Sequence, residues 1–265
     1  MFLDQRVKYN QDLRSLIICL TTITLLLIGF VSDINTRWYF LIIPLQTLLS
    51  FLCCIINHNH THHSTFKSSN LKRLFEYLLT FARGHTSFGV ITPHNLNHHI
   101  YVGTHCDWSH DELAGKGWGI VRIFRYLLQS SLQIWRERNK KGSPKLNIDQ
   151  EKNRKRQKYF LLILMLIAFY CDPLKFILLW LLPWFLSMEI LLFINLIQHD
   201  GLGKKSRDFT GKNINFFVFN NGFHTVHHFN PNLHWSLLPS HHQTLKTDQS
   251  SLLLFIMKNY FFKIW

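Results

Sequence analysis

The chain has 265 residues, of which 47% are hydrophobic, 15% aromatic and only 17% charged, and this composition excludes a disordered chain, which would be polar. Its five cysteines show no framework spacing, which excludes a disulfide-stapled secreted domain. The 29 lysines and arginines against 15 acidic residues give a net charge of +14, which leaves a basic membrane protein or a nucleic-acid-binding protein.

Two apolar runs open the chain, one over residues 16–31 and the other over residues 38–56. A bilayer core of about 30 Å needs about 20 apolar residues as helix, so both runs are long enough to cross it. No small-residue cleavage site follows the first run, so we interpret it as an uncleaved span and not as a signal peptide. We expect transmembrane helices over residues 15–32 and 38–57.

A third apolar stretch covers residues 159–198 and is broken once, by the segment Asp172-Pro173-Leu174-Lys175. Proline and two charges are unfavourable in the middle of a bilayer, so the stretch predicts a hairpin of two spans. We expect these spans over residues 159–172 and 176–198. The first is short, and snorkelling of the preceding lysines and arginines would extend it.

Charge supports the four-span topology, which places residues 58–158 and 199–265 on one side of the membrane. Residues 57–158 carry 17 lysines and arginines against 7 acids, and residues 199–265 carry 7 against 3. The positive-inside rule assigns these segments to the cytoplasm. We therefore predict an all-α fold over residues 1–265, one domain with four transmembrane helices and a cytosolic helical cap. No nucleic-acid motif accompanies the basic residues, which makes nucleic-acid binding the weaker interpretation.

The 17 histidines gather in clusters. The sequence reads HNHTHH over residues 58–63, HNLNHH over 94–99 and HTVHH over 224–228, and NLIQH over 195–199 adds a fourth element. Residues three and four apart share one face of a helix, so each cluster is able to direct its imidazoles at one point. The topology places all four clusters on the same side of the membrane.

Imidazole is a ligand for iron, zinc, copper and nickel. A catalytic zinc site needs three protein ligands, so eight or nine histidines indicate two metal ions. Neutral ligands around two irons suit the binding of dioxygen. A histidine-rich metal buffer or transporter is the main non-enzymatic alternative. Transporters usually carry ionisable residues inside their spans, whereas here only Glu189 lies within one.

These motifs resemble the three histidine boxes of the membrane fatty acid desaturase and hydroxylase superfamily. NLIQHDGL resembles the superfamily's intervening Asn-x-x-x-His element, and it is close to the H-Y-G-L motif of the alkane hydroxylase branch. Asp200 stands where that motif has an aromatic residue, and this departure argues against a close relationship to the alkane hydroxylases. The order and spacing of the motifs match over residues 16–238.

The resemblance implies a set of iron ligands, box by box. These are His58 and His62; His94, His98 and His99; His199, with Asn195 as a water-mediated or weak ligand; and His224, His227 and His228. His60 lies about 200° around the helix from His58 and is expected to point away. The histidines outside the boxes are expected at the surface or beside the ligands: His85, His105, His110, His234, His241 and His242. For Asp107 and Glu112 there are two interpretations: acids that orient ligand imidazoles through their second ring nitrogens, or solvated acids, and we favour the second.

The resemblance also implies the activity: an O2-dependent oxidase with two Fe²⁺ ions, acting on fatty acyl or lipid chains. We expect a desaturase first, a fatty acid or alkane-type hydroxylase second, and a metal-handling membrane protein third. No Cys-rich iron–sulfur run and no fused haem domain is present in the 265 residues, so an external ferredoxin or cytochrome is expected to supply electrons. The expected partners are therefore the membrane, a lipid substrate and this donor, without nucleic acid.

Overall fold

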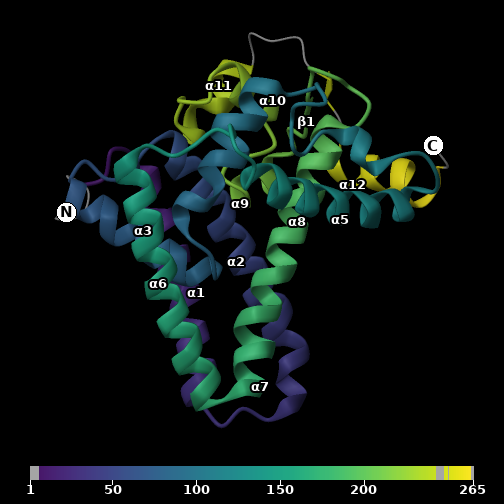
Figure 1. Ribbon diagram of the computed structural model, residues 1–265. Helices are drawn as coiled ribbons and strands as arrows, with labels where there is room; N and C mark the ends of the chain where they lie inside the picture. Colours follow the sequence, from purple (N-terminus) through teal and green to yellow (C-terminus); the bar gives the residue numbers. More distant parts are fainter. Residues whose placement is uncertain (1–5, 243–247, 250, 264–265) are drawn as a thin grey trace. The chain divides into compact units, whose positions relative to one another are not determined.

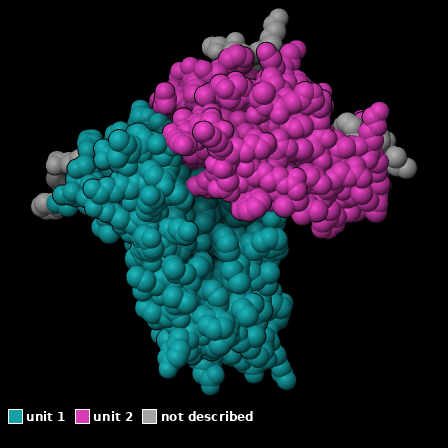
Figure 2. All heavy atoms as spheres, in the orientation of Figure 1, with its two compact units in different colours: residues 1–89, 146–190 teal, residues 90–145, 191–265 magenta. Residues whose placement is uncertain are grey.

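The computed structural model describes residues 6–242, 248–249 and 251–263 (Figure 1). The chain divides into two compact units, coloured separately in Figure 2. Unit 1 comprises residues 1–89 and 146–190, and unit 2 comprises residues 90–145 and 191–265. Helices dominate both units, which confirms the all-α prediction. The folding of the whole chain as one domain stays a prediction.

Unit 1 is built from long helices and their connecting turns. In chain order they are η1 (Asn10–Asp12), α1 (Leu13–Val31), η2 (Thr36–Trp38), α2 (Tyr39–His62), α3 (Ser69–Arg83), η3 (Ser87–Val90), α6 (Ile148–Cys171), α7 (Pro173–Lys175), η6 (Phe176–Leu181) and the first half of α8 (Leu182–His199). Figure 1 shows α6 and this half of α8 running in opposite directions, joined through α7. The predicted hairpin is therefore present.

Three helical segments are long and apolar enough to cross a membrane: Asn10–Val31, Thr36–His62 and Pro173–His199. They correspond to three of the four predicted spans. The remaining one, residues 159–172, is the C-terminal half of α6, whose N-terminal half is strongly charged. The four-span count therefore stays a prediction.

The helices of unit 1 pack through small residues and capped ends. A Cβ added to Gly29 would lie 2.9 Å from Cδ1 of Leu179, so the glycine lets α1 and η6 approach closely. In lipid the hydrophobic effect does not drive helices together, so helices associate through close packing, and small residues at their interfaces make that packing possible. At the end of α1, the ammonium of Lys175 donates hydrogen bonds to the carbonyls of Phe30 (3.0 Å) and Ser32 (2.8 Å). These bonds satisfy carbonyls that the end of the helix leaves without partners.

Unit 2 is built from shorter elements. In chain order they are the π-helix η4 (Ile91–His98), α4 (His99–Tyr101), η5 (Asp111–Ala114), α5 (Gly119–Arg138), the second half of α8, β1 (Arg207–Asp208), α9 (Lys212–Phe217), α10 (His224–Phe229), η7 (Trp235–Leu237), α11 (Leu238–His242), β2 (Asp248–Gln249), α12 (Leu252–Ile256) and η8 (Met257–Phe261). The two strands form a parallel pair. The C-terminal elements α12 and η8 follow each other directly in the chain.

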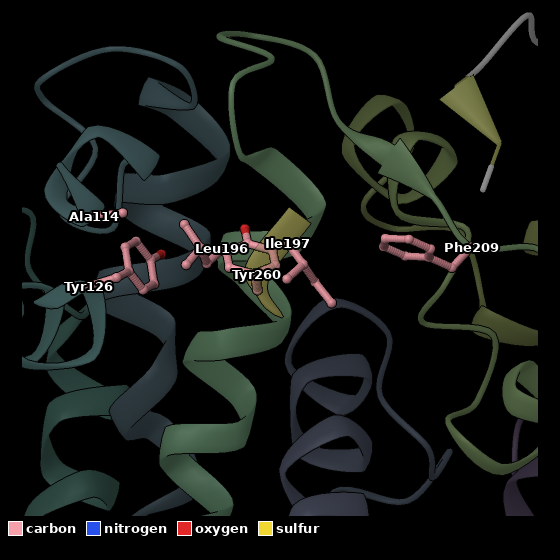
Figure 3. Close-up of a cluster of buried hydrophobic side chains, with 6 residues drawn as sticks. All are labelled: Ala114, Tyr126, Leu196, Ile197, Phe209 and Tyr260. Carbon is pink, nitrogen blue, oxygen red and sulfur yellow. The ribbon is translucent and has the colours of Figure 1, made fainter. Parts of the chain in front are cut away.

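A buried cluster holds α5, α8 and η8 together in unit 2 (Figure 3). Its members are Ala114, Tyr126, Leu196, Ile197, Phe209 and Tyr260. On α5 the buried residues recur every three or four positions, at 119, 122, 126 and 130, as expected for one buried helix face. Gly119 lets α5 and η8 approach closely, because a Cβ there would lie 2.3 Å from Cα of Tyr260. The cluster fixes the end of α8, which carries His199.

Candidate metal centre

Four histidines of unit 2 bring their ring nitrogens together at the end of α8. Each offers one nitrogen, and the four nitrogens lie within 4.8 Å of one another. Nε2 of His224 lies 2.9 Å from Nε2 of His199 and 3.1 Å from Nε2 of His228. The His98 ring lies 4.9 Å from the His199 ring, between centroids. We call this set cluster A: His98, His199, His224 and His228.

The contacts in cluster A are those of ligands around an ion. Nε2 of a neutral imidazole carries either one N–H or one lone pair, so Nε2 of His224 is unable to form proper hydrogen bonds with both neighbouring Nε2 atoms. Two nitrogens bound at right angles about 2.1 Å from one metal ion lie about 3 Å apart, which is the spacing seen here. Burial, together with the imidazoles of His228 and His199, lowers the pKa of His224 well below its ordinary value. His224 is therefore held in the neutral form that binds metal.

His98 is oriented by a buried carboxylate. Oδ2 of Asp107 lies 2.8 Å from Nδ1 of His98, and Oδ1 of Asp107 accepts hydrogen bonds from the backbone and hydroxyl of Ser109. Burial alone would raise the pKa of Asp107, but the hydrogen bonds with His98 and Ser109 outweigh it and hold the pKa below its ordinary value. Nε2 of His98 is buried and has no hydrogen-bond partner among the described residues.

The expectation of a solvated Asp107 is therefore wrong. The carboxylate is buried and fixes the tautomer of His98, with the proton on Nδ1 and the lone pair of Nε2 directed at cluster A. Glu112, by contrast, has a side chain that is 66% exposed, as expected.

A second set in unit 2 consists of His94, His99 and His227, which we call cluster B. Nε2 of His99 lies 3.0 Å from Nε2 of His94 and 3.1 Å from Nε2 of His227. The three ligand nitrogens lie within 4.8 Å of one another. Cluster B therefore repeats the spacing of the Nε2 atoms in cluster A, with other histidines of the second and third boxes.

The π-helical form of η4 explains how the second box serves both clusters. Its hydrogen bonds join residues five apart, so His94 and His99 come to lie on one face. Spacing of an ordinary α-helix would instead pair His94 with His98. The helix begins at Ile91, so that Pro93 lies in its first turn. Adjacent residues His98 and His99 thus contribute to different clusters.

The first box lies in unit 1, in the last two turns of α2. The rings of His58 and His62 are in edge contact, 5.1 Å apart between centroids. His60 is buried on another side, where Nδ1 lies 3.0 Å from the hydroxyl of Thr65 and Nε2 lies 3.8 Å from a carboxylate oxygen of Glu76. The helical pairing of His58 with His62, and the separation of His60 from them, are as predicted.

Asn195 lies one turn before His199 on α8. Its amide donates a hydrogen bond of 2.7 Å to the hydroxyl of Tyr126, which itself donates to the carbonyl of Ser109 at 2.8 Å. The structure therefore ties Asn195 to the segment that holds Asp107. Its predicted role as a weak or water-mediated ligand stays a prediction.

A buried ion pair, which sequence reasoning missed, holds the residue after His199. The guanidinium of Arg122 donates two hydrogen bonds to the carboxylate of Asp200, at 2.9 and 2.7 Å, and the hydroxyl of Tyr260 donates a third. Burial lowers the pKa of Arg122, but Asp200 more than compensates and raises it above its ordinary value. Asp200 thus anchors the end of α8 to α5 and η8, which accounts for the charged residue at this point of the NLIQHDGL motif.

Comparison with known families agrees with this geometry. A family model described as fatty acid desaturase matches residues 35–256, a range that contains both clusters, Asn195 and the first box. Neither the curated proteins nor the solved structures contain a match to the chain. The family match covers most of the sequence and includes every histidine motif, and the chain therefore belongs to the fatty acid desaturase family.

Proposed function

We propose that the protein is an O2-dependent membrane oxidase that holds two iron ions and desaturates fatty acyl or lipid chains. The observation that carries the proposal is the presence of two separate clusters of converging imidazole nitrogens in unit 2. A single metal ion would occupy only one of the two clusters, so the presence of both supports two ions. The family match supports the oxidation of fatty acyl chains.

The ligands follow from the clusters and from the boxes. Cluster A holds one iron and cluster B contributes to the other. His58 and His62 are included as ligands on the family resemblance, and Asn195 as a weak or water-mediated one. The donor set fits iron, because neutral imidazoles suit Fe²⁺ and because the free lone pair of His98 is already directed at cluster A.

The bound iron pair would supply the activation of dioxygen and the removal of hydrogen from an unactivated C–H bond. The chain's own residues do the rest. Asp107 keeps the proton of His98 on Nδ1, so that Nε2 stays available as a ligand. Arg122 and Tyr260 hold Asp200 and, through it, the helix turn that carries His199. Burial of His98, His199 and His224 keeps bulk water away from the reacting centre.

The surroundings of the site complete the proposal. The chain is a multi-pass membrane protein with four spans, its histidine boxes lie on the cytoplasmic side, and a ferredoxin or cytochrome delivers electrons from outside. Support comes from the three apolar helical segments and from the excess of lysine and arginine in residues 57–158.

The test is expression of the chain in a lipid-producing host, followed by mass spectrometry of the fatty acids and metal analysis of the purified protein. We expect new double bonds and two irons per chain, and His224→Ala abolishes the double bonds. His241→Ala is the matched control, because His241 is an exposed histidine outside both clusters. New hydroxyl groups instead would favour the hydroxylase. Stoichiometric zinc with unchanged lipids would favour the metal-handling protein and overturn the proposal.

A further inference from the structure

A third group of metal-binding side chains lies in unit 2, on the segment that follows the second box. His105, His110 and Glu112 each offer one ligand atom, and the three atoms lie within 4.8 Å of one another. None of the three belongs to a histidine box, and none takes part in cluster A or cluster B. The family resemblance therefore assigns them no role.

The contacts within this group have the spacing of ligands. Nδ1 of His105 lies 3.2 Å from Oε2 of Glu112, and the rings of His105 and His110 are in edge contact at 5.5 Å. Two ligand atoms about 2.1 Å from one ion in a tetrahedral site lie about 3.4 Å apart. Nδ1 of His110 is a buried atom with no hydrogen-bond partner among the described residues. A buried polar atom without a partner is costly, and an ion would satisfy it.

The backbone beside the group is held firmly. The carboxylate of Asp111 accepts a hydrogen bond of 2.7 Å from the backbone N–H of Gly201. Gly103 has a φ of +71°, and a Cβ there would lie 2.3 Å from the carbonyl carbon of Gly203. These contacts join the segment of His105 and His110 to the turn after α8. Beside them lies a cavity of about 330 Å³, lined by residues 103–105 and 110–112 with Gly201 and Gly203.

We propose that His105, His110 and Glu112 form a third metal site, which binds a divalent ion of the zinc class and is separate from the two iron positions. Two imidazoles and one carboxylate are ligands that zinc uses, whereas magnesium and calcium prefer oxygen alone. Three protein ligands leave one tetrahedral position for water, and the cavity provides the room for it.

A metal ion at this third site would also affect cluster A. The same segment carries Asp107, which orients His98, and Ser109, whose carbonyl accepts the hydrogen bond of Tyr126. An ion bound to residues on both sides of Asp107 and Ser109 restrains this segment. We therefore expect zinc to raise the thermal stability of the protein, because the three ligands are brought together only in the folded chain, which binds zinc more tightly than the unfolded chain.

The experiment compares zinc binding by the full chain in detergent, loaded with iron beforehand, and the iron retained after zinc treatment reports any exchange of zinc into the boxes. The protein is equilibrated with Zn²⁺, freed of unbound metal and analysed for zinc and iron by mass spectrometry. Wild type is expected to hold one more zinc per chain than His105→Ala/His110→Ala. The second variant, Glu112→Gln, changes only an exposed side chain and is also expected to lose the zinc. His241→Ala is the control and keeps it.

Equal zinc in wild type and in both variants overturns the proposal, as does a loss of zinc in His241→Ala. X-ray absorption at the zinc edge gives a second readout, and we expect a first shell of nitrogen and oxygen with two imidazoles. A shell without imidazole would contradict the site. The iron content is measured in the same samples, so a failure of this site is distinguishable from a failure of the diiron proposal.

Discussion

Asp107 and His98 form a buried pair, in which Oδ2 of the carboxylate lies 2.8 Å from Nδ1 of the imidazole. In metal sites such a carboxylate sets the tautomer and the orientation of the ligand. The pair connects an acid that belongs to no motif with a histidine of the second box. Its effect is testable by changing the acid alone.

The first prediction concerns Asp107→Asn. The amide keeps the shape of the carboxylate, but with Ser109 still bound to its oxygen it presents N–H to Nδ1 of His98. The proton of neutral His98 then moves to Nε2, and the ligand lone pair is lost. We expect iron affinity to fall by about 10-fold to 100-fold, measured by competition with a chelator. Asp149→Asn, an exposed aspartate, is the control, and equal affinities in the two variants would contradict this role of Asp107.

The second prediction concerns His224, the histidine whose Nε2 contacts two other members of cluster A. His224→Ala removes the central ligand, so we expect the iron content to fall to about half while the ion at cluster B is retained. Metal analysis of purified protein measures this directly. Full retention of iron would show that cluster A binds none.

The third prediction concerns the ion pair of Arg122 and Asp200. Removing one member of a buried pair leaves an uncompensated charge, so Arg122→Met is expected to cost about 3 kcal/mol or more of unfolding free energy. The double variant Arg122→Met/Asp200→Leu removes both charges and is expected to recover most of this loss. Denaturant titration in detergent measures both. A double variant as unstable as the single one would show that packing, and not charge, dominates here.

The fourth prediction tests the topology with two native cysteines. Cys106 and Cys171 are exposed, whereas Cys19, Cys53 and Cys54 are buried. If α6 crosses the membrane, Cys106 lies in the cytoplasm and Cys171 on the opposite side. A membrane-impermeant maleimide added to intact cells is expected to label Cys171 alone, and to label Cys106 only after permeabilisation. Cys171→Ser is the control, because labelling of intact cells that is lost in this variant is assigned to Cys171.

Protection of both cysteines in intact cells would mean that α6 does not cross. With three transmembrane helices instead of four, His58 and His199 would lie on opposite sides of the membrane. The diiron proposal would then fail together with the four-span topology.

Local sequence patterns predicted the parts of the fold that depend on local interactions. Apolar runs identified α1, α2 and the hairpin of α6 and α8, because a helix of sufficient length needs only composition to be recognised. Spacing of three or four residues predicted that His58 and His62 share a face, and so do His224 and His228.

Local sequence patterns did not predict which histidines belong to cluster A and which to cluster B. This division depends on the π-helical turn at Ile91–His98, which changes the period on which the prediction rested. The orienting role of Asp107 was considered but not favoured, and the role of Arg122 was missed. Arg122 contacts Asp200 across 78 positions of the chain, and no local pattern encodes such a contact. Its place among the buried positions of α5, with Gly119 and Tyr126, was the available signal.

The π-helical turn has one more implication. His98 and His99 are joined by a peptide bond, yet they serve cluster A and cluster B respectively. A rotation or shift of this turn displaces a ligand of each cluster at the same time. Whatever ions the two clusters hold, their properties are mechanically linked, so evolution or engineering is unable to retune one position while leaving its neighbour untouched.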